Sequence, residues 1–446
     1  MKKYIVFLLF PFAVAAQKNY PQLLDQYMTA QNQFKGFTGT VLVMKQNKVL
    51  LRKAYGMADR EWNIPNTPET KFEIGSLTKQ FTAACILQLV EQGKLSLDDK
   101  LSKFFPAFYK GDSVTIHMLL NHTSGIPSFT GLAAFDKIEK LTWSRDSMID
   151  FFNNKPYDFS PGSTFKYNNS GPFLLGFIIE KITGLTYETY LRKNIFDKIG
   201  MSATGLNHWD TILPLRAKGY EMVKGKPVNA PFVSLEWPFS SGALFSTIDD
   251  LYKWDRALYS NTILSENSKQ KMFTPGKGNY GYGFYVDSFE QHPHIWHTGG
   301  ISGFHSNMAR FPKDDVFIIV LGNTALVQTN TIRIVNNLSE GLADIVFDVP
   351  VEVPYLHKEV AIDPALLDKF VGKYNAGLTV EVIKKDNKLY RHRPGSEDIE
   401  LKPESNTKFF YANGSNIQLE FILDANGNIT KIWFINNEQR GEMKKL

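Results

Sequence analysis

The chain has 446 residues, 43% of them apolar and 21% charged, which is the composition of a globular protein with room for two or three domains. A fully disordered or fibrous protein is therefore excluded. The 50 basic and 45 acidic side chains give a formal net charge of +5. Because the sequence contains no long basic run, this charge gives no reason to expect a nucleic-acid partner.

The first residues have the pattern of a secretory signal. Lys2 and Lys3 precede an uncharged stretch, residues 4–16, that ends in small side chains and is too short to cross a membrane. We expect residues 1–16 to be a signal peptide, so that the protein is exported and is either periplasmic or secreted. Cleavage would leave 48 basic and 45 acidic side chains, a net charge of +3. No later stretch is apolar enough to predict a membrane span.

Strand signals bracket a helical region between residues 20 and 347. Apolar runs next to turn residues predict strands, and apolar stretches closed by a glycine predict helices. The predicted elements, in chain order, are a hairpin over 39–51, helices over 76–92, 172–184 and 247–258, strands over 294–298, 304–311 and 316–321, and a helical stretch over 330–347. Strands at both ends of a helical region predict an α+β fold whose antiparallel sheet is completed by distant segments.

The character of the sequence changes after residue 347. A segment with prolines, residues 348–362, predicts a linker between two domains, 20–347 and 363–446. A short helix over 364–370 and several short strands separated by turns then predict a small all-β barrel or sandwich. These strands are expected over 379–383, 388–392, 417–423 and 429–435.

Disulfide and metal chemistry find little support in the sequence. The only cysteine, Cys85, lies in an apolar run, cannot form a disulfide within the chain and is typical of a core residue. His292, His294 and His297 are close in sequence. However, His294 and His297 are three apart on an expected strand and should point to opposite faces. We therefore expect no metal site.

The first chemical motif is Ser76-x-x-Lys79, at the start of the predicted buried helix. Residues three apart on a helix share a face, so the Ser76 hydroxyl and the Lys79 amine should be neighbours. A buried lysine loses its proton more readily than a free one and could take the proton of the serine. The pattern alone is equally consistent with a serine that caps the helix.

Two further motifs lie later in the chain. Tyr167 and Asn169, two apart in an extended loop, should face one cavity, where tyrosine can carry a proton and an amide can hold a substrate carbonyl. His297 and Thr298 end an expected strand, and the two glycines after them would let a substrate lie close to its edge. Each motif alone also fits an ordinary loop or strand end.

The three motifs occur in the order Ser-x-x-Lys, Tyr-x-Asn and Lys/His-Thr-Gly, and in this the chain resembles the serine β-lactamase and penicillin-binding-protein superfamily. The tyrosine motif is similar to that of the class C branch, which also contains DD-peptidases, D-aminopeptidases and esterases. Segments 72–75, 119–127, 241–247 and 280–283 are similar as well. The resemblance covers about residues 37–323. It implies an antiparallel sheet flanked by helices with a helical subdomain, and in some relatives a lipocalin-like barrel follows.

The resemblance also implies roles for the motif residues. Ser76 corresponds to the acylated nucleophile, Lys79 to its basic partner and Tyr167 to a second acid/base group. Asn169 would orient the substrate, and the N–H groups of Ser76 and Gly300 would form the oxyanion hole.

The far wall of the implied site departs from the β-lactamase pattern. His297 and Thr298 would line this wall and bind substrate, but β-lactamases of the branch usually carry lysine at the position of His297. Because histidine is mostly neutral at pH 7, we expect a weak preference for carboxylate-bearing substrates that grows as the pH falls toward about 6. The histidine also lowers the expectation of efficient β-lactam hydrolysis.

The sequence thus predicts an exported serine hydrolase that cleaves an amide or ester bond through a Ser76 acyl-enzyme, without a metal or organic cofactor. The leading substrates are a peptide that contains a D-residue and a small ester. A class C-type β-lactamase and a non-hydrolysing penicillin-binding sensor or cell-wall binding module remain alternatives. The C-terminal domain is expected to shape the cleft or to mediate homo-oligomer contacts.

Overall fold

The computed structural model describes residues 18–326, 331–355, 357–377, 379–413, 415, 417–436 and 439–446. The predicted signal peptide, residues 1–16, lies outside these ranges. None of the helices within them has both the length and the apolar character that crossing a bilayer requires.

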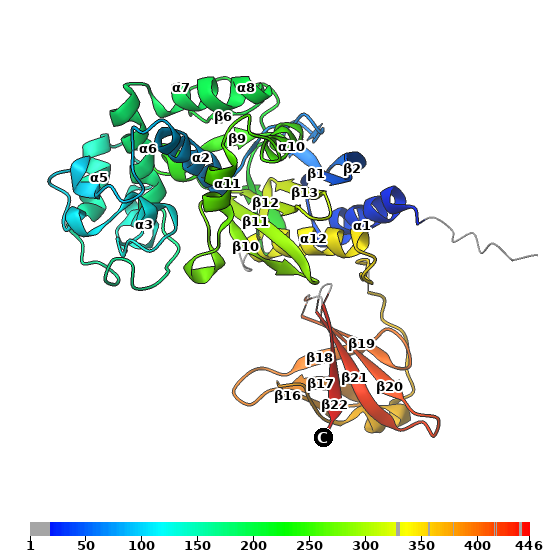
Figure 1. Ribbon diagram of the computed structural model, residues 1–446. Helices are drawn as coiled ribbons and strands as arrows, with labels where there is room; N and C mark the ends of the chain where they lie inside the picture. The colour runs from blue at the N-terminus through cyan, green and yellow to red at the C-terminus, as the bar shows by residue number, and fades with distance from the viewer. Residues whose placement is uncertain are drawn as a thin grey trace, which may run out of the picture.

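A six-stranded antiparallel sheet forms the centre of the larger part of the chain (Figure 1). Its strands, in spatial order, are β10 Tyr285–Phe289, β11 His292–Ile301, β12 Phe304–Phe311, β13 Val316–Gly322, β1 Gly39–Lys45 and β2 Lys48–Tyr55. The first strand of the chain pairs with β13, so that Gly39 lies opposite Gly322. The predicted hairpin and the completion of the sheet by distant segments are confirmed.

The sheet has a hydrophobic core on each face because the side chains of its strands alternate. In β1, Val41 packs with the helices at the two ends of this part, α1 Tyr20–Lys35 and α12 Thr331–Val346, whereas Leu42 packs into the larger core on the other face. Figure 1 shows α1 and α12 side by side against the sheet.

A helical layer on the larger core carries the candidate site. Its helices are α2 Thr78–Glu91, α3 Ile116–Leu120, α4 Phe135–Ile138, α5 Arg145–Asn153, α6 Ser170–Thr183, α7 Tyr187–Leu191, α8 Asp197–Ile199, α9 Phe239–Gly242, α10 Ile248–Ala257 and α11 Glu266–Phe273. As predicted, α2 is buried on nearly all sides. It begins two residues later than expected because residues 75–77 form a separate 3₁₀ turn.

Three small sheets complete this part of the chain. They are β3 Met57–Asp59 with β4 Ile64–Pro65; β5 Phe72–Glu73 and β6 Gly205–Leu206 on either side of β9 Leu244–Ser246; and β14 Thr324–Leu326, β7 Tyr220–Val223 and β8 Lys226–Asn229. The second of these sheets matters for the site, because β5 leads directly into the 3₁₀ turn that contains Ser76.

The C-terminal part is a closed eight-stranded antiparallel barrel, which confirms the predicted barrel-like fold. Its strands are β15 Gly372–Asn375, β16 Thr379–Lys385, β17 Lys388–His392, β18 Ile399–Pro403, β19 Lys408–Tyr411, β20 Ile417–Leu423, β21 Ile429–Asn436 and β22 Gln439–Lys445. Large side chains such as Tyr374, Phe409 and Phe421 fill the interior together with Phe370 of the 3₁₀ helix Pro364–Phe370. The interior is therefore a packed core.

Candidate active site

Ser76 lies in the 3₁₀ turn Gly75–Leu77, between β5 and α2. Its neighbour Gly75 has a φ of 53°, and a Cβ atom at that position would lie 2.6 Å from the backbone nitrogen of Gly300 in β11. Only glycine fits such a backbone next to another strand. The turn is thus pressed against the edge of β11, which brings the first and third motifs together.

Lys79 lies one turn further on, in the first turn of α2, and is almost completely buried. Its Nζ atom lies 2.9 Å from Oγ of Ser76, 2.9 Å from Oδ1 of Asn169 and 2.8 Å from the carbonyl oxygen of Ser241. Burial holds the pKa of the Lys79 amine well below its usual range. The site therefore favours a neutral amine, which donates to two of these oxygens and keeps a lone pair for the third.

Tyr167 lies close to both Lys79 and Ser76. Its ring centroid is 5.0 Å from Nζ of Lys79, and its hydroxyl is hydrogen-bonded to Ser76. Burial raises the pKa of the phenol above its ordinary value of about 10, and the hydrogen bond with Ser76 opposes this only in part. The phenol therefore keeps its proton near neutral pH.

The segment before α6 positions Asn169. The backbone N–H of Asn169 donates to Oγ of Ser128 at 3.1 Å, and its Nδ2 donates to Oγ1 of Thr130 at 3.1 Å. The capping hydrogen bond at the start of α6 comes from Asn168, whose Oδ1 accepts the N–H of Gly171 at 2.7 Å. Asn169 is thus free to turn its Oδ1 toward Lys79.

His297, in β11, contacts the same tyrosine, with ring centroids 5.9 Å apart. Only 1% of its surface is exposed. Its Nδ1–H donates to the Thr298 carbonyl oxygen at 2.5 Å, and its Nε2 accepts the hydroxyl of Tyr280 at 3.0 Å. Protein groups therefore occupy both ring nitrogens. Burial lowers the pKa of His297 to about 3.

This pKa corrects the expected pH dependence of substrate preference. A ring that titrates near pH 3 does not become charged as the pH falls toward 6, so His297 cannot strengthen carboxylate recognition in that range. Sequence reasoning used the reference value for an exposed histidine. The fully buried setting and the bonds to Tyr280 and Thr298 could not be read from the spacing alone.

The other histidines of β11 are not arranged around a common centre. His292 pairs with Asp314 at 2.9 Å, and His294 pairs with Asp287 at 3.0 Å. Across the described residues there is no group of three or more histidine, cysteine or acidic side chains that could hold a metal ion.

Comparison with known proteins identifies the family. The β-lactamase family model matches residues 22–335, more than half of the chain. The chain belongs to the β-lactamase family.

Two proteins named for penicillin binding are similar over most of this chain. Penicillin-binding protein 4* of Bacillus subtilis is 30% identical over 413 residues, covering 87% of this chain and 90% of its own length. The octameric penicillin-binding protein homologue from Pyrococcus abyssi has a TM-score of 0.66 and 27% identity, and covers 95% of this chain and 99% of its own.

An amidase is also similar. The D-amino acid amidase from Ochrobactrum anthropi SV3 has a TM-score of 0.63 and 26% identity, with 74% of this chain and 98% of the amidase covered. The predicted relation to the serine β-lactamase and penicillin-binding-protein superfamily is confirmed, and the chain is a serine hydrolase of that superfamily.

Sequence reasoning missed several residues that shape the site. Ser241 contributes only its backbone carbonyl, so no side-chain motif could reveal its contact with Lys79. Ser128 and Thr130 hold Asn169 from a loop about 40 positions away in the chain. The Tyr-Gly-Tyr-Gly segment that contains Tyr280 was noted for its similarity, but its contact with His297 depends on the fold.

Proposed function

We propose that the protein hydrolyses an amide or ester through an acyl-enzyme formed on Ser76. The observation that carries this proposal is the 2.9 Å contact between Oγ of Ser76 and Nζ of the buried Lys79. In its neutral form, Lys79 accepts the serine proton while oxygens of Asn169 and Ser241 hold its two N–H groups. The oxygen of Ser76 then attacks the substrate carbonyl carbon.

The other motif residues divide the remaining work. Tyr167, protonated at neutral pH, donates its proton to the leaving group and later takes one from the attacking water. The backbone N–H groups of Ser76 and Gly300 stabilise the negative charge on the carbonyl oxygen of the tetrahedral intermediate. Asn169 orients the substrate amide, and Thr298 binds it from the edge of β11.

The wall of the site formed by His297 and its aromatic neighbours carries no charge and therefore favours uncharged substrate groups. His297 is neutral and has no free ring nitrogen, and its ring neighbours Tyr167, Tyr280 and Tyr285 all have a raised phenol pKa and are uncharged. We therefore propose a small ester or an amide of a D-residue as the substrate. The similarity to the D-amino acid amidase supports the amide.

A labelling experiment tests the proposal. The full chain is incubated with a fluorophosphonate and, separately, with a fluorescent penicillin, and the site of added mass is located by peptide mass spectrometry. We expect covalent mass on Ser76, no label in Ser76→Ala, and turnover of a D-amino acid amide or ester by the wild type. Label at another residue, or full activity in Ser76→Ala, would show that the nucleophile is wrongly assigned.

The names of the relatives favour a second candidate, a penicillin-binding sensor that is acylated but does not turn over. For such a sensor we expect a penicillin adduct on Ser76 that persists for hours. Rapid loss of that adduct would instead indicate β-lactamase activity. Adduct lifetime, measured by intact-protein mass spectrometry after removal of free penicillin, separates the two.

We also propose export of the protein and assembly through the C-terminal barrel. The sequence pattern of residues 1–16 supports export. An octameric relative that covers 95% of this chain supports assembly. Fractionation of the natural host, with N-terminal sequencing of the mature protein, tests the first. Light scattering of the full chain tests the second.

A further inference from the structure

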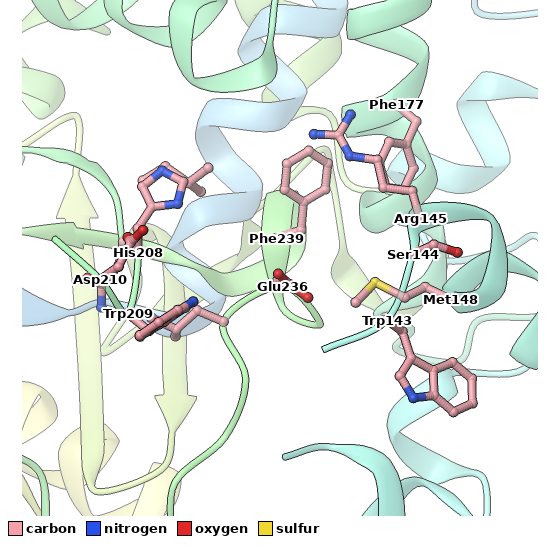
Figure 2. A pocket seen from close by; sticks show the side chains of 13 residues that line it. Trp143, Ser144, Arg145, Met148, Phe177, His208, Trp209, Asp210, Glu236 and Phe239 are labelled. Atoms are coloured by element: carbon pink, nitrogen blue, oxygen red, sulfur yellow. The ribbon is translucent and has the colours of Figure 1, made fainter. Parts of the chain in front are cut away.

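The structure contains a cavity of about 420 Å³, whose lining side chains are drawn in Figure 2. Its walls come from residues 143–148 at the start of α5, residues 206–210 in and after β6, and residues 235–239 before and in α9, together with Phe177 of α6. None of the residues proposed for catalysis or substrate binding lines it. Its size is within the usual range for sites that bind small organic ligands.

Four of the thirteen residues that line this cavity are phenylalanine or tryptophan. Phe177 and Phe239 stack with ring centroids 4.9 Å apart. Trp143 lies on one wall, and Trp209 on the opposite loop is 70% exposed. Aromatic faces pack against flat or apolar groups and attract cations through their ring electrons.

The basic side chains of the cavity already have partners. Arg145 is ion-paired with Glu180, and its guanidinium carbon lies 5.2 Å from the centroid of the Phe177 ring. His208 pairs with Glu188 at 3.0 Å. These two groups are therefore poorly placed to attract an anionic ligand.

Two carboxylates of the cavity remain available. Glu236 and Asp210 both line it, and no lysine or arginine within the described part of the chain lies at ion-pair distance from either. Figure 2 shows Glu236 between Trp209 on one side and Met148 on the other. An aromatic cavity with two unpaired carboxylates is complementary to an organic cation.

The cavity is connected to the candidate catalytic centre on two sides. Phe239 begins α9, and the carbonyl oxygen of Ser241, two residues later, contacts Lys79. On the opposite wall, Nδ2 of Asn207 donates to Oε1 of Glu73 at 2.9 Å, on the strand that leads into the nucleophile turn. A ligand in the cavity therefore contacts elements that hold the nucleophile and its base.

We propose that this cavity binds an organic cation with an aromatic or branched apolar body, whose ammonium group is attracted by the carboxylates of Glu236 and Asp210. Such a group has two sources. It is either an ammonium on the acyl side of the substrate or a free amine that binds as an effector. The first source rests on the proposed function, whereas the second does not.

Calorimetric titration of the full chain tests the binding without reference to activity. The probes are 2-phenylethylammonium, the neutral 2-phenylethanol and the anionic 3-phenylpropionate. We expect the ammonium to bind about tenfold more tightly than the alcohol, the contribution of one charge-assisted contact, and the anion to bind more weakly than both. Because Glu236 is exposed, Glu236→Gln should fold normally. It should lose most of the preference for the ammonium.

Matched controls locate the effect. Asp210→Asn should weaken ammonium binding as Glu236→Gln does, whereas Asp150→Asn, which removes an exposed carboxylate of α5 outside the cavity, should not. Equal affinity for the ammonium and the alcohol, or unchanged ammonium binding in both cavity variants, would overturn the proposal. Neither result depends on whether Ser76 becomes labelled.

Steady-state kinetics then show whether the bound ammonium group belongs to the substrate or to an effector. If the ammonium belongs to the substrate, 2-phenylethylammonium inhibits competitively and Glu236→Gln raises KM for ammonium-bearing acyl groups only. If the cation is an effector, 2-phenylethylammonium changes kcat at saturating substrate, and Glu236→Gln abolishes that change.

Discussion

Asn207 donates a hydrogen bond from Nδ2 to Oε1 of Glu73 at 2.9 Å, and so joins the segment after β6 to the strand that enters the Ser76 turn. Burial raises the pKa of the Glu73 carboxyl to about 7, although the charge of Arg216 and the bond from Asn207 both oppose the rise. A carboxyl with a raised pKa holds its proton more tightly in the folded chain than in the unfolded one.

We predict that Glu73→Gln makes the folded protein less sensitive to alkaline pH. The raised pKa contributes fully to stability at pH values below the pKa of the glutamate in the unfolded chain, which is about 4.3. This contribution is lost as the pH rises through about 7, the pKa in the folded chain. Glutamine keeps an oxygen for Asn207 but cannot ionise. Raising the pH from 5 to 8 should therefore lower the free energy of unfolding less in the variant than in the wild type. The difference should reach up to about 3 kcal/mol.

Urea unfolding of both proteins at pH 5 and pH 8 measures the difference. Glu69→Gln is the control, because that glutamate is exposed and its pKa is lowered by Arg52 rather than raised. If the free energy of unfolding falls equally in the wild type and in Glu73→Gln, ionisation of the Glu73 carboxyl does not destabilise the fold and the prediction is wrong.

We predict that His297→Lys raises acylation by carboxylate-bearing substrates and leaves neutral esters nearly unchanged. The carboxylate of the substrate would keep a lysine at this position charged, because an opposite charge favours the ammonium, and the wall is otherwise uncharged. Charge-assisted bonds exceed neutral ones by roughly 1 kcal/mol or more, which corresponds to about tenfold in rate. Acylation rates of a penicillin and of a neutral ester, compared in both proteins, measure the effect. An equal response of the two substrates would separate His297 from carboxylate recognition.

The same assay tests the buried neutral state of His297. In the wild type, the ratio of the two acylation rates should stay constant from pH 5.5 to 8.5, because the ring titrates near pH 3. A ratio that rises toward pH 6 would show that the ring is protonated in that range and would restore the expectation from the sequence.

We predict that Tyr167→Phe affects amides far more than activated esters. Its phenol keeps its proton at neutral pH and so can protonate a poor leaving group, which contributes typically 10²–10⁴-fold. A p-nitrophenolate leaves without such help. We expect kcat/KM for a D-amino acid amide to fall by about that range and for the p-nitrophenyl ester of the same acid by about tenfold or less. Equal losses would place Tyr167 in serine activation instead.

Patterns that depend on neighbouring residues were predicted well from the sequence. The predicted strand 304–311 matches β12, and the predicted short helix 364–370 matches the 3₁₀ helix. The glycine that closes α6, Gly184, has a φ of 68° as a helix-ending glycine should. In the barrel, four strands were not predicted, namely β15, β18, β19 and β22. Charged residues dominate β22 and also occur in β18, which ends in a proline, whereas β15 and β19 are only four residues long.

In the candidate site too, contacts between residues close in sequence could be predicted, whereas contacts between distant segments could not. The spacing of Ser76 and Lys79 predicts their contact, because one turn of helix fixes it. The contacts of Tyr280 with His297 and of Lys79 with Ser241 join segments 17 and 162 positions apart. Only the tertiary fold determines such pairs, and they are the ones that set the charge state of the site.

The boundary between the two parts of the chain separates their hydrophobic cores. The barrel core consists of residues between Ile362 and Phe434 with Met443, and it is a cluster separate from the two cores around the six-stranded sheet. All motif residues precede Val353. We therefore expect a chain that ends at Val353 to fold, to be labelled at Ser76 by a fluorophosphonate and to turn over a small ester at a rate within a few fold of the full chain.

Residues 363–446 alone should give the circular dichroism of a β-barrel and a cooperative thermal transition. If the barrel mediates assembly, light scattering should show the shorter chain as a monomer. Loss of cooperative unfolding in the shorter chain would mean that the two parts depend on one another for stability. Retained folding with lost turnover would instead show that the barrel helps to form the substrate cleft.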